Sequence, residues 1–399
     1  MMQKPQSPVL VAPGIHWVGA LNPELKKFDV VMETKYGTSY NAYLIQGTEK
    51  TALIETVKDG FLPESLALIR QLIDPAKIDY LILQHTEPDH SGSVAGMLDA
   101  APNAKLLCTR PAGMNLPFIA GRELPIEVVK EGDSIDLGGR TLTFIMAPFL
   151  HWPDTMFTYD SQTGVLFTCD AFGCHYAAEN ILESKTAPSF KEARRYYYDC
   201  IVSPFAASVT KAIRHVNELN LPKLTAICPS HGPVLDADPM DAIQLYAQWA
   251  AERTATDGKT AFIGYVSCYG FTKLLAERLQ KTLADAGWTA RLADLSEISA
   301  EEAADCIYGS DCVAIGTPTV NSDALPPIWT SLAHVSIPLV RGKKAVVFGS
   351  YGWSGEAVAA VEQRLNGLGI KVLGTYRVRF RPDDAAMAEM DRLAALITG

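Results

Sequence analysis

The chain has 399 residues, a formal net charge of −10 and 20% charged residues, which predicts a soluble globular protein with more than one domain. No apolar run approaches the roughly 18 residues needed to span a bilayer. The negative charge also disfavours nonspecific binding to nucleic acid or to anionic membranes, which requires a basic face.

The N-terminal residues 1–8 lack the apolar stretch of a secretory signal, so we expect no export and a cytoplasmic location. Eight cysteines are scattered along the chain without a CxxC pair. This distribution is typical of a reducing compartment, and it excludes a rubredoxin-type iron site within this chain.

The first part of the chain alternates short apolar runs with turn residues, and residues 16–57 therefore predict a meander of strands. Helices are predicted at about 64–73 and 94–100, and strands at 105–109 and 141–146.

A dense group of possible metal ligands follows a short apolar run at residues 81–83. His85, Glu87, Asp89 and His90 come directly after this predicted strand. Burying these side chains requires a cation, because unpaired buried charge costs several kcal/mol or more. A dinuclear metal centre would supply it. Nitrogen and oxygen ligands suit iron, manganese or zinc, and the share of carboxylates favours iron.

Three further apolar runs also end in a candidate ligand, namely His151, Asp170 and His231. A layered α/β protein gathers such residues from distant parts of the sequence at one edge of its sheets. We therefore expect all seven side chains to form one site.

A polar, turn-prone segment at about 251–259 predicts a linker between a domain at 1–252 and a second domain at 259–399. In the second domain strands, loops and helices recur, with strands at 260–266, 312–316 and 345–348. This pattern predicts a doubly wound parallel sheet, which binds ligands at the carboxyl ends of its strands.

The loops at those strand ends predict a mononucleotide site. The first loop is rich in hydroxyl groups and opens a helix, as a phosphate cradle requires, but it lacks the GxGxxG and GxxxxGK[ST] motifs. The loop aromatics could cover a flat ring, so FMN is the predicted ligand. The predicted binding residues are Ser267, Cys268, Tyr269, Gly270, Phe271 and Thr272, then Thr317, Pro318, Thr319, Val320 and Asn321, and finally Ser350, Tyr351, Gly352, Trp353, Ser354 and Gly355.

The ligand series and the flavodoxin-like half resemble the flavodiiron proteins over nearly the whole chain. The resemblance implies a metallo-β-lactamase-like αβ/βα sandwich followed by a flavodoxin-like domain. Zinc hydrolases of the wider superfamily carry His in place of Glu87, which favours iron here. By the resemblance His85, Glu87 and His151 would bind one iron, Asp89, His90 and His231 the other, and Asp170 would bridge them.

Some residues near the ligands depart from the family or have no assigned role. Members often carry Gln in place of Cys174, and Cys169 precedes Asp170; we expect both sulfurs to serve mainly in packing. His175 and Tyr198 are candidates for contact with the metal ligands, as the family places a tyrosine there.

The resemblance implies reduction of O2 to water, with reduction of NO to N2O as a second activity. Electrons would pass from an external donor, most simply rubredoxin, through FMN to the irons in a head-to-tail homodimer or homotetramer, and a basic patch should lie near the flavin. The alternatives are a predominantly NO-reducing enzyme, a zinc hydrolase with the same ligands, and a flavin electron carrier without catalytic metal. Glu87 and the second domain disfavour the hydrolase.

Overall fold

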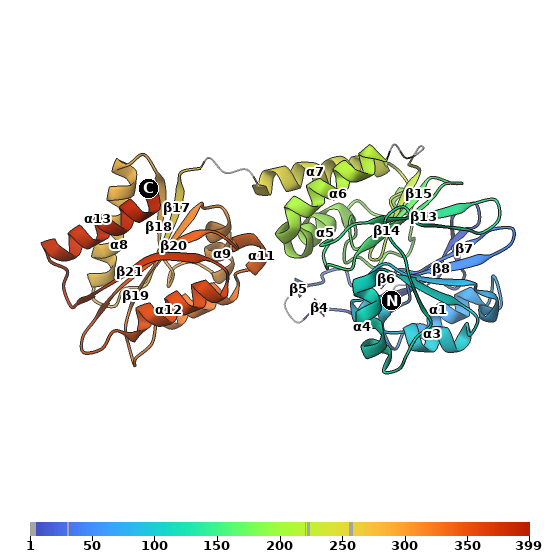
Figure 1. The fold of residues 1–399 in the computed structure, drawn as a ribbon, viewed down its shortest axis with the longest axis horizontal. Coiled ribbons are helices and arrows are strands. Elements are labelled where there is room, and N and C mark those ends of the chain that lie inside the picture. Colours follow the sequence, from blue (N-terminus) through green and yellow to red (C-terminus); the bar gives the residue numbers. More distant parts are fainter. Residues whose placement is uncertain (1–4, 30–31, 220, 222–223, 255–257) are drawn as a thin grey trace. The chain divides into compact units, whose positions relative to one another are not determined.

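The computed structural model describes residues 5–29, 32–219, 221, 224–254 and 258–399. The chain divides into two compact units, Met1–Arg253 and Thr254–Gly399 (Figure 1). Among the described helices none is long and apolar enough to cross a membrane.

Two sheets form the centre of the N-terminal unit. The first is antiparallel from β1 to β8 and parallel from β8 to β11. In spatial order its strands are β1 (Val9–Ala12), β2 (Ile15–Trp17), β7 (Tyr43–Gln46), β8 (Thr51–Ile54), β9 (Tyr80–Leu83), β10 (Lys105–Cys108) and β11 (Ile126–Val128).

The second sheet is antiparallel except for its last pair, which is parallel. Its strands are β12 (Ser134–Asp136), β13 (Thr141–Met146), β14 (Met156–Asp160), β15 (Val165–Cys169) and β16 (Ala226–Pro229). Alternate residues of β15 belong to different cores: Val165 and Phe167 pack with the first sheet, and Leu166 packs with helices on the outer face. This is the predicted αβ/βα sandwich.

Helices cover both outer faces of the sandwich (Figure 1). They are α1 (Leu62–Ile69), α3 (Val94–Ala100), α4 (Arg110–Ala120), α5 (Phe190–Tyr197), α6 (Ala206–Glu218) and α7 (Pro239–Thr254), and the short helix α2 (Pro88–Ser91) follows β9. Short 3-10 segments occur at Pro75–Lys77, Glu183–Lys185 and Ser203–Phe205, and a π-helical turn at Tyr198–Val202. Two small antiparallel pairs join β3 (Ala20–Asn22) to β6 (Thr38–Tyr40) and β4 (Lys27–Phe28) to β5 (Met32–Glu33).

The C-terminal unit is one parallel sheet with helices on both faces, as predicted. In spatial order the strands are β18 (Thr289–Asp294), β17 (Thr260–Tyr265), β19 (Cys312–Pro318), β20 (Lys344–Tyr351) and β21 (Lys371–Arg379). One face packs on α8 (Phe271–Asp285) and α13 (Asp384–Thr398); the other packs on α9 (Ala300–Tyr308), α10 (Pro326–Ala333), α11 (Ile337–Val340) and α12 (Glu356–Gly367).

The helix predicted at about 64–73 differs in its bounds from the observed helix α1. It begins at Leu62, with Pro63 in its first turn where a missing N–H costs nothing, and it ends at Ile69. Leu72 and Ile73, assigned to the helix because they are apolar, instead lie in turns that both bond back to Ile69 O. Apolar spacing alone does not locate the end of a helix.

Candidate metal centre and flavin-binding site

The sandwich brings all seven predicted metal ligands together. The side chains of six are buried, and that of His151 is 14% exposed. His85 follows β9, Asp170 follows β15 and His231 follows β16, while Asp89 and His90 lie in the short helix α2. Parallel strands place their carboxyl ends at one sheet edge, and this edge collects the ligands.

The two oxygens of Asp170 divide the donors into two sets. The Nε2 atoms of His85 and His151 stand 3.5 and 3.4 Å from Oδ2, and both also face Glu87 Oε2, at 3.3 and 3.1 Å. On the other side, the Nε2 atoms of His90 and His231 stand 3.1 and 3.6 Å from Oδ1. Asp89 completes this second set, with Oδ1 3.4 Å from His90 and Oδ2 3.0 Å from His231.

This donor set fits a pair of metal ions. Both oxygens of Asp89 and Asp170, and Nε2 of His90, are buried and make no properly directed hydrogen bond to any described residue. Buried polar atoms are otherwise almost always satisfied, so their convergence indicates cations. Donors about 2.0–2.2 Å from one ion lie about 3.0–3.5 Å apart, close to the separations here. The donor atoms of His85, Glu87, His90 and Asp170 lie within 4.8 Å of one another, as do those of Asp89, His90 and His231.

The charges of the metal-free cluster compensate one another. Burial alone would raise the pKa of Glu87, but its hydrogen bonds with His151 and His85 lower that pKa to about 2. Burial conversely disfavours protonated His151, yet Asp170 and Glu87 raise its pKa to about 10. In the absence of metal, protonated histidines therefore balance the carboxylate charges that metal cations would otherwise balance.

Two ligands are oriented by neighbours on their far side. His85 Nδ1 stands 3.1 Å from Asp154 Oδ1, and the other oxygen of Asp154 accepts from Thr86 N at 3.0 Å. His231 Nδ1 donates to the carbonyl oxygen of Ser39 at 2.5 Å. Such contacts fix the ring and leave Nε2 for a metal.

Sequence reasoning missed Asp154 and Asp29 at this site. Asp154 lies three residues after His151 in a turn, not after a strand, so the pattern of strand ends did not select it. The carboxyl of Asp29 is hydrogen-bonded to Glu87, and its pKa is raised by burial and by the charges of Glu87 and Asp89. It directly follows β4, and only the tertiary structure reveals that it lies near the cluster.

The two candidate neighbours of the cluster occupy different surroundings. The His175 ring stands 4.9 Å from the His231 ring and its Nδ1 contacts Thr38 Oγ1 at 2.9 Å; burial and His231 lower its pKa to about 3. The tyrosine beside His175 is Tyr197, at 5.0 Å between rings. Tyr198 instead packs against Tyr246 and Trp249, so the tyrosine near the ligands is the residue before the predicted one.

The two cysteines near the cluster are buried thiols. Burial raises the pKa of Cys174 to about 12 and that of Cys169 well above its usual value. Cys174 packs on Gly232, where an added Cβ would stand 2.6 Å from its sulfur. Both thiols are buried, and the packing role that we expected for them stays a prediction.

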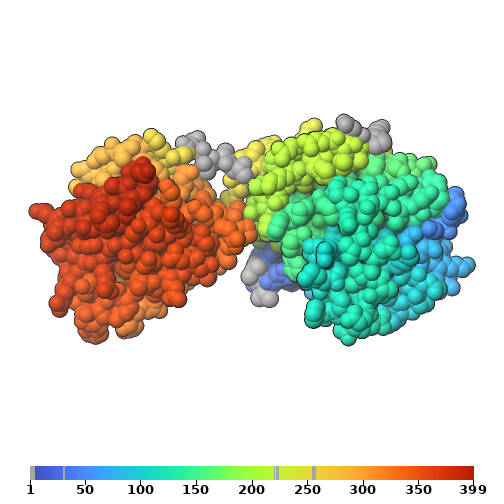
Figure 2. Space-filling view, viewed as in Figure 1, coloured from blue at the N-terminus to red at the C-terminus, as the bar shows by residue number. Residues whose placement is uncertain are grey.

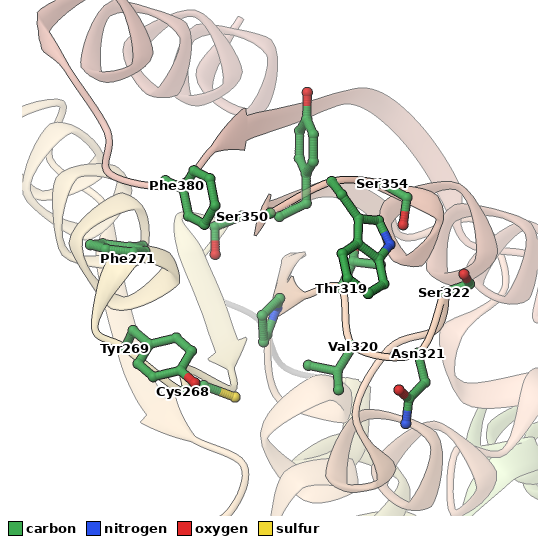
Figure 3. Close-up of a pocket in the computed structure, with 14 residues that line it drawn as sticks. Cys268, Tyr269, Phe271, Thr319, Val320, Asn321, Ser322, Ser350, Ser354 and Phe380 are labelled. Atoms are coloured by element: carbon green, nitrogen blue, oxygen red, sulfur yellow. The ribbon is translucent and has the colours of Figure 1, made fainter.

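The C-terminal unit carries a pocket of about 280 Å³ at the carboxyl ends of its strands. Tyr269 and Cys268 lie on one side of it and Val320 and Asn321 on the other (Figure 3), and the buried Ser350 also lines it. Most predicted flavin residues line it; Ser322 and Phe380 are additions, and Ser267, Gly270, Thr272, Thr317 and Gly355 do not reach the lining.

Some of the predicted residues that do not line the pocket shape its loops. Thr272 is fully buried at the start of α8, and its hydroxyl is 2.9 Å from Ser350 Oγ, so it joins two of the three loops. Ser267 Oγ accepts from Lys273 N, in the first turn of α8. At the rim Trp353 and Tyr269 are 89% and 86% exposed, which leaves their ring faces free for a planar ligand.

The fold and the donor set together define a flavoprotein oxidoreductase with a β-lactamase-like metal domain. The family model described as ODP family beta lactamase matches residues 38–232, and the flavodoxin model matches residues 263–392. Flavo-diiron protein FprA2 of Clostridium acetobutylicum is 39% identical over 91% of this chain and 92% of its own.

Two further relatives match this chain over nearly its full length. A protein of Moorella thermoacetica named nitric oxide reductase is 36% identical over 92% of this chain and 91% of its own. The solved structure of rubredoxin oxygen:oxidoreductase from Desulfovibrio gigas matches with a TM-score of 0.71 at 31% identity, over 98% of each chain. This chain belongs to the flavodiiron protein family. The family implies FMN and a diiron centre, and the His, Asp and Glu cluster is able to bind metal.

Proposed function

We propose that this protein reduces O2 to water and, as a second activity, reduces NO to N2O, with FMN and a non-haem diiron centre as cofactors. The observation that carries this proposal is the division of the buried donors into two sets that share Asp170. When bound, the flavin would supply electrons and the two irons would supply coordination positions for a diatomic substrate.

The residues of the chain would hold and shield these groups. Asp170 spans both donor sets, and Asp154 and Ser39 keep the rings of His85 and His231 aimed at the cluster. The Tyr197 hydroxyl keeps its proton, because burial and nearby carboxylates raise its pKa well above the usual value. Burial of the other donors limits access to the side of His151.

Anaerobic kinetics tests the substrate. One preparation, reduced without excess donor, would be given O2 or NO in separate stopped-flow experiments. We expect consumption of both gases, with the higher second-order rate constant for O2. The reverse order would assign the protein as predominantly an NO reductase. Consumption no faster than that by free flavin would support the alternative that the protein is a flavin electron carrier without a catalytic metal.

Metal analysis separates iron from zinc. Glu87 adds a third carboxylate to the cluster, which favours iron over zinc. We expect two irons per chain and a yellow protein after purification under anaerobic conditions. Two zinc ions per chain without flavin would instead identify a hydrolase.

We also propose an acidic, rubredoxin-like electron donor. Arg377 and Arg379 are exposed at the end of β21, bonded to the carbonyl oxygens of Gly355 and Gly352 beside the pocket, and Arg381 follows them. These arginines form a local basic group on a chain of charge −10. Reduction by rubredoxin should slow with rising salt. At a given salt concentration, Arg381→Glu should slow reduction by rubredoxin without changing reduction by dithionite. An unchanged rate of reduction by rubredoxin in this variant would exclude docking at this rim.

A head-to-tail dimer, or a dimer of dimers, completes the proposal. Exposed aromatic side chains lie at both sites, Trp353 and Phe380 beside the flavin pocket and Phe149 beside His151, and such residues are enriched at interfaces. Sedimentation of the loaded protein measures its assembly state, and a stable monomer would exclude this route for electrons.

A further inference from the structure

An apolar cavity lies on the outer face of the second sheet, under helices α6 and α7. Leu166 of β15 lies at its floor, and Val209 of α6 and Ile243 of α7 lie opposite. All three are buried, and α6 forms part of the molecular surface (lime in Figure 2). The cavity is thus a gap left where two helices meet a sheet.

Size and lining select what this cavity can hold. The space open to the centre of a water-sized sphere is about 10 Å³, so one small molecule fits. The atoms that line it are apolar. A buried water needs two to four polar partners, whereas apolar cavities stay dry and take up uncharged species such as xenon. An ion or a polar substrate is excluded for the same reason, since it would lose its hydration without compensation.

The cavity also adjoins the metal ligands along the chain. Leu150 and Ala171 contribute to its lining, and they are the direct neighbours of His151 and Asp170. His151 is also the most exposed of the seven predicted ligands. The lining of the cavity is therefore joined through the backbone to His151 of one donor set and to Asp170, which both sets share.

We infer that this cavity binds an uncharged diatomic gas and supplies it to the metal centre. The inference rests on the proposed function, because it takes O2 or NO as the substrate. Both gases are uncharged and weakly hydrated, so they partition into apolar space, and a site lined by the chain neighbours of His151 and Asp170 would hold them close to the cluster. No bond is formed or broken at this site.

Xenon is the probe, and helix α6 offers a matched pair of variants. Ala212 lines the cavity from a half-buried position, so Ala212→Phe should fill it; Ala207, on the exposed side of the same helix, provides the control Ala207→Phe. Val216→Phe is a second filling variant, should Ala212→Phe not fold. Xenon-pressurised crystals of the loaded protein should show an anomalous peak in the cavity for the wild type and the control, and none for the filled variants.

Kinetics then tests the supply of substrate. We expect filling to lower kcat/KM for the gas by about threefold or more, with kcat, metal content and flavin content unchanged. Absence of xenon from the wild type, or unchanged kcat/KM in a filled variant that has lost xenon, overturns the inference while the proposed function stands. If the wild type binds xenon but consumes neither gas, the proposed function fails instead, and a role in supplying substrate fails with it.

Discussion

The contact between His85 and Asp154 is the clearest case at the scale of single residues. Asp154 accepts from the imidazole with one oxygen and from the backbone N–H of Thr86 with the other, and Thr86 Oγ1 bonds to the same carboxylate. All its partners are donors, so a charged carboxylate satisfies every one. Burial alone would raise the pKa of Asp154, but His85 and Thr86 lower it.

Asp154→Asn should therefore weaken metal binding. The amide nitrogen would have to face either His85 or Thr86, where a donor already stands, and the His85 ring would lose its fixed orientation. We expect a loss of about 10- to 100-fold in affinity for the metal nearest His85. Competition with a chelator measures it. The control is Asp160→Asn, which changes a buried aspartate bonded to Thr163 in a β-turn at the end of β14. Equal affinities in the two variants would refute the positioning role.

The stability of the metal-free protein should depend on pH in a defined direction. His151 has its pKa raised from 6.5 to about 10, so its contribution is complete below pH 6.5 and is lost as pH rises towards 10. Glu87 has its pKa lowered from 4.5 to about 2, so its contribution is complete above pH 4.5 and is lost as pH falls towards 2.

Thermal unfolding of chelator-treated protein should therefore show Tm falling above pH 6.5 and below pH 4.5. The metal-loaded protein should behave differently on the alkaline side, because bound metal requires histidines without their protons and replaces their charge. A metal-free protein that is more stable at pH 9 than at pH 6.5 would contradict this balance of charges.

At the scale of elements, strand ends determine both sites. In each unit, short apolar strands end in loops that carry the polar side chains. Sequence patterns located these strands well, because buried strands are short apolar runs bounded by turn residues. They did not place Phe380, which follows β21 and reaches the flavin pocket, because the patterns predicted no strand at Lys371–Arg379.

The loop after β20 gives a test at this scale. Trp353 is 89% exposed at the pocket rim, so Trp353→Ala costs little folding stability but removes a ring face for the flavin. We expect the flavin affinity to fall by about fivefold, corresponding to about 1 kcal/mol of lost stacking. Titration of flavin-free protein with FMN, followed by fluorescence quenching, measures it. Phe118→Ala, a change at an aromatic residue that is 88% exposed in the N-terminal unit, should leave the affinity unchanged.

At the scale of the whole molecule, the candidate metal ligands and the candidate flavin residues belong to separate units. His90→Ala should therefore deplete the metal and spare the flavin, and Thr319→Trp should fill the flavin pocket and spare the metal. Each variant should be inactive alone, and each provides the control for the other's cofactor content.

Hybrid dimers of these two variants test how electrons reach the metal. Co-expression with two different affinity tags allows the hybrid to be isolated. If the flavin of one subunit serves the metal of the other, the hybrid keeps one intact junction of two and about half of the wild-type activity. If the flavin serves the metal of its own chain, neither chain of the hybrid carries both cofactors, and the hybrid should be inactive. An inactive hybrid with full complements of the remaining cofactors would exclude the head-to-tail arrangement.

The αβ/βα sandwich was predicted from the resemblance to a family, whereas residue patterns alone predicted the doubly wound sheet, the seven candidate metal ligands and the three candidate flavin loops. These features are local, because a ligand or loop directly after an apolar strand is visible in the order of residues. Only the tertiary structure brought Asp154 behind His85, Asp29 beside Glu87, and Tyr197 in place of Tyr198 beside His175. Those contacts join segments far apart in the chain. The packing of sheets and helices decides which of these side chains meet, and no local sequence pattern marks such a contact.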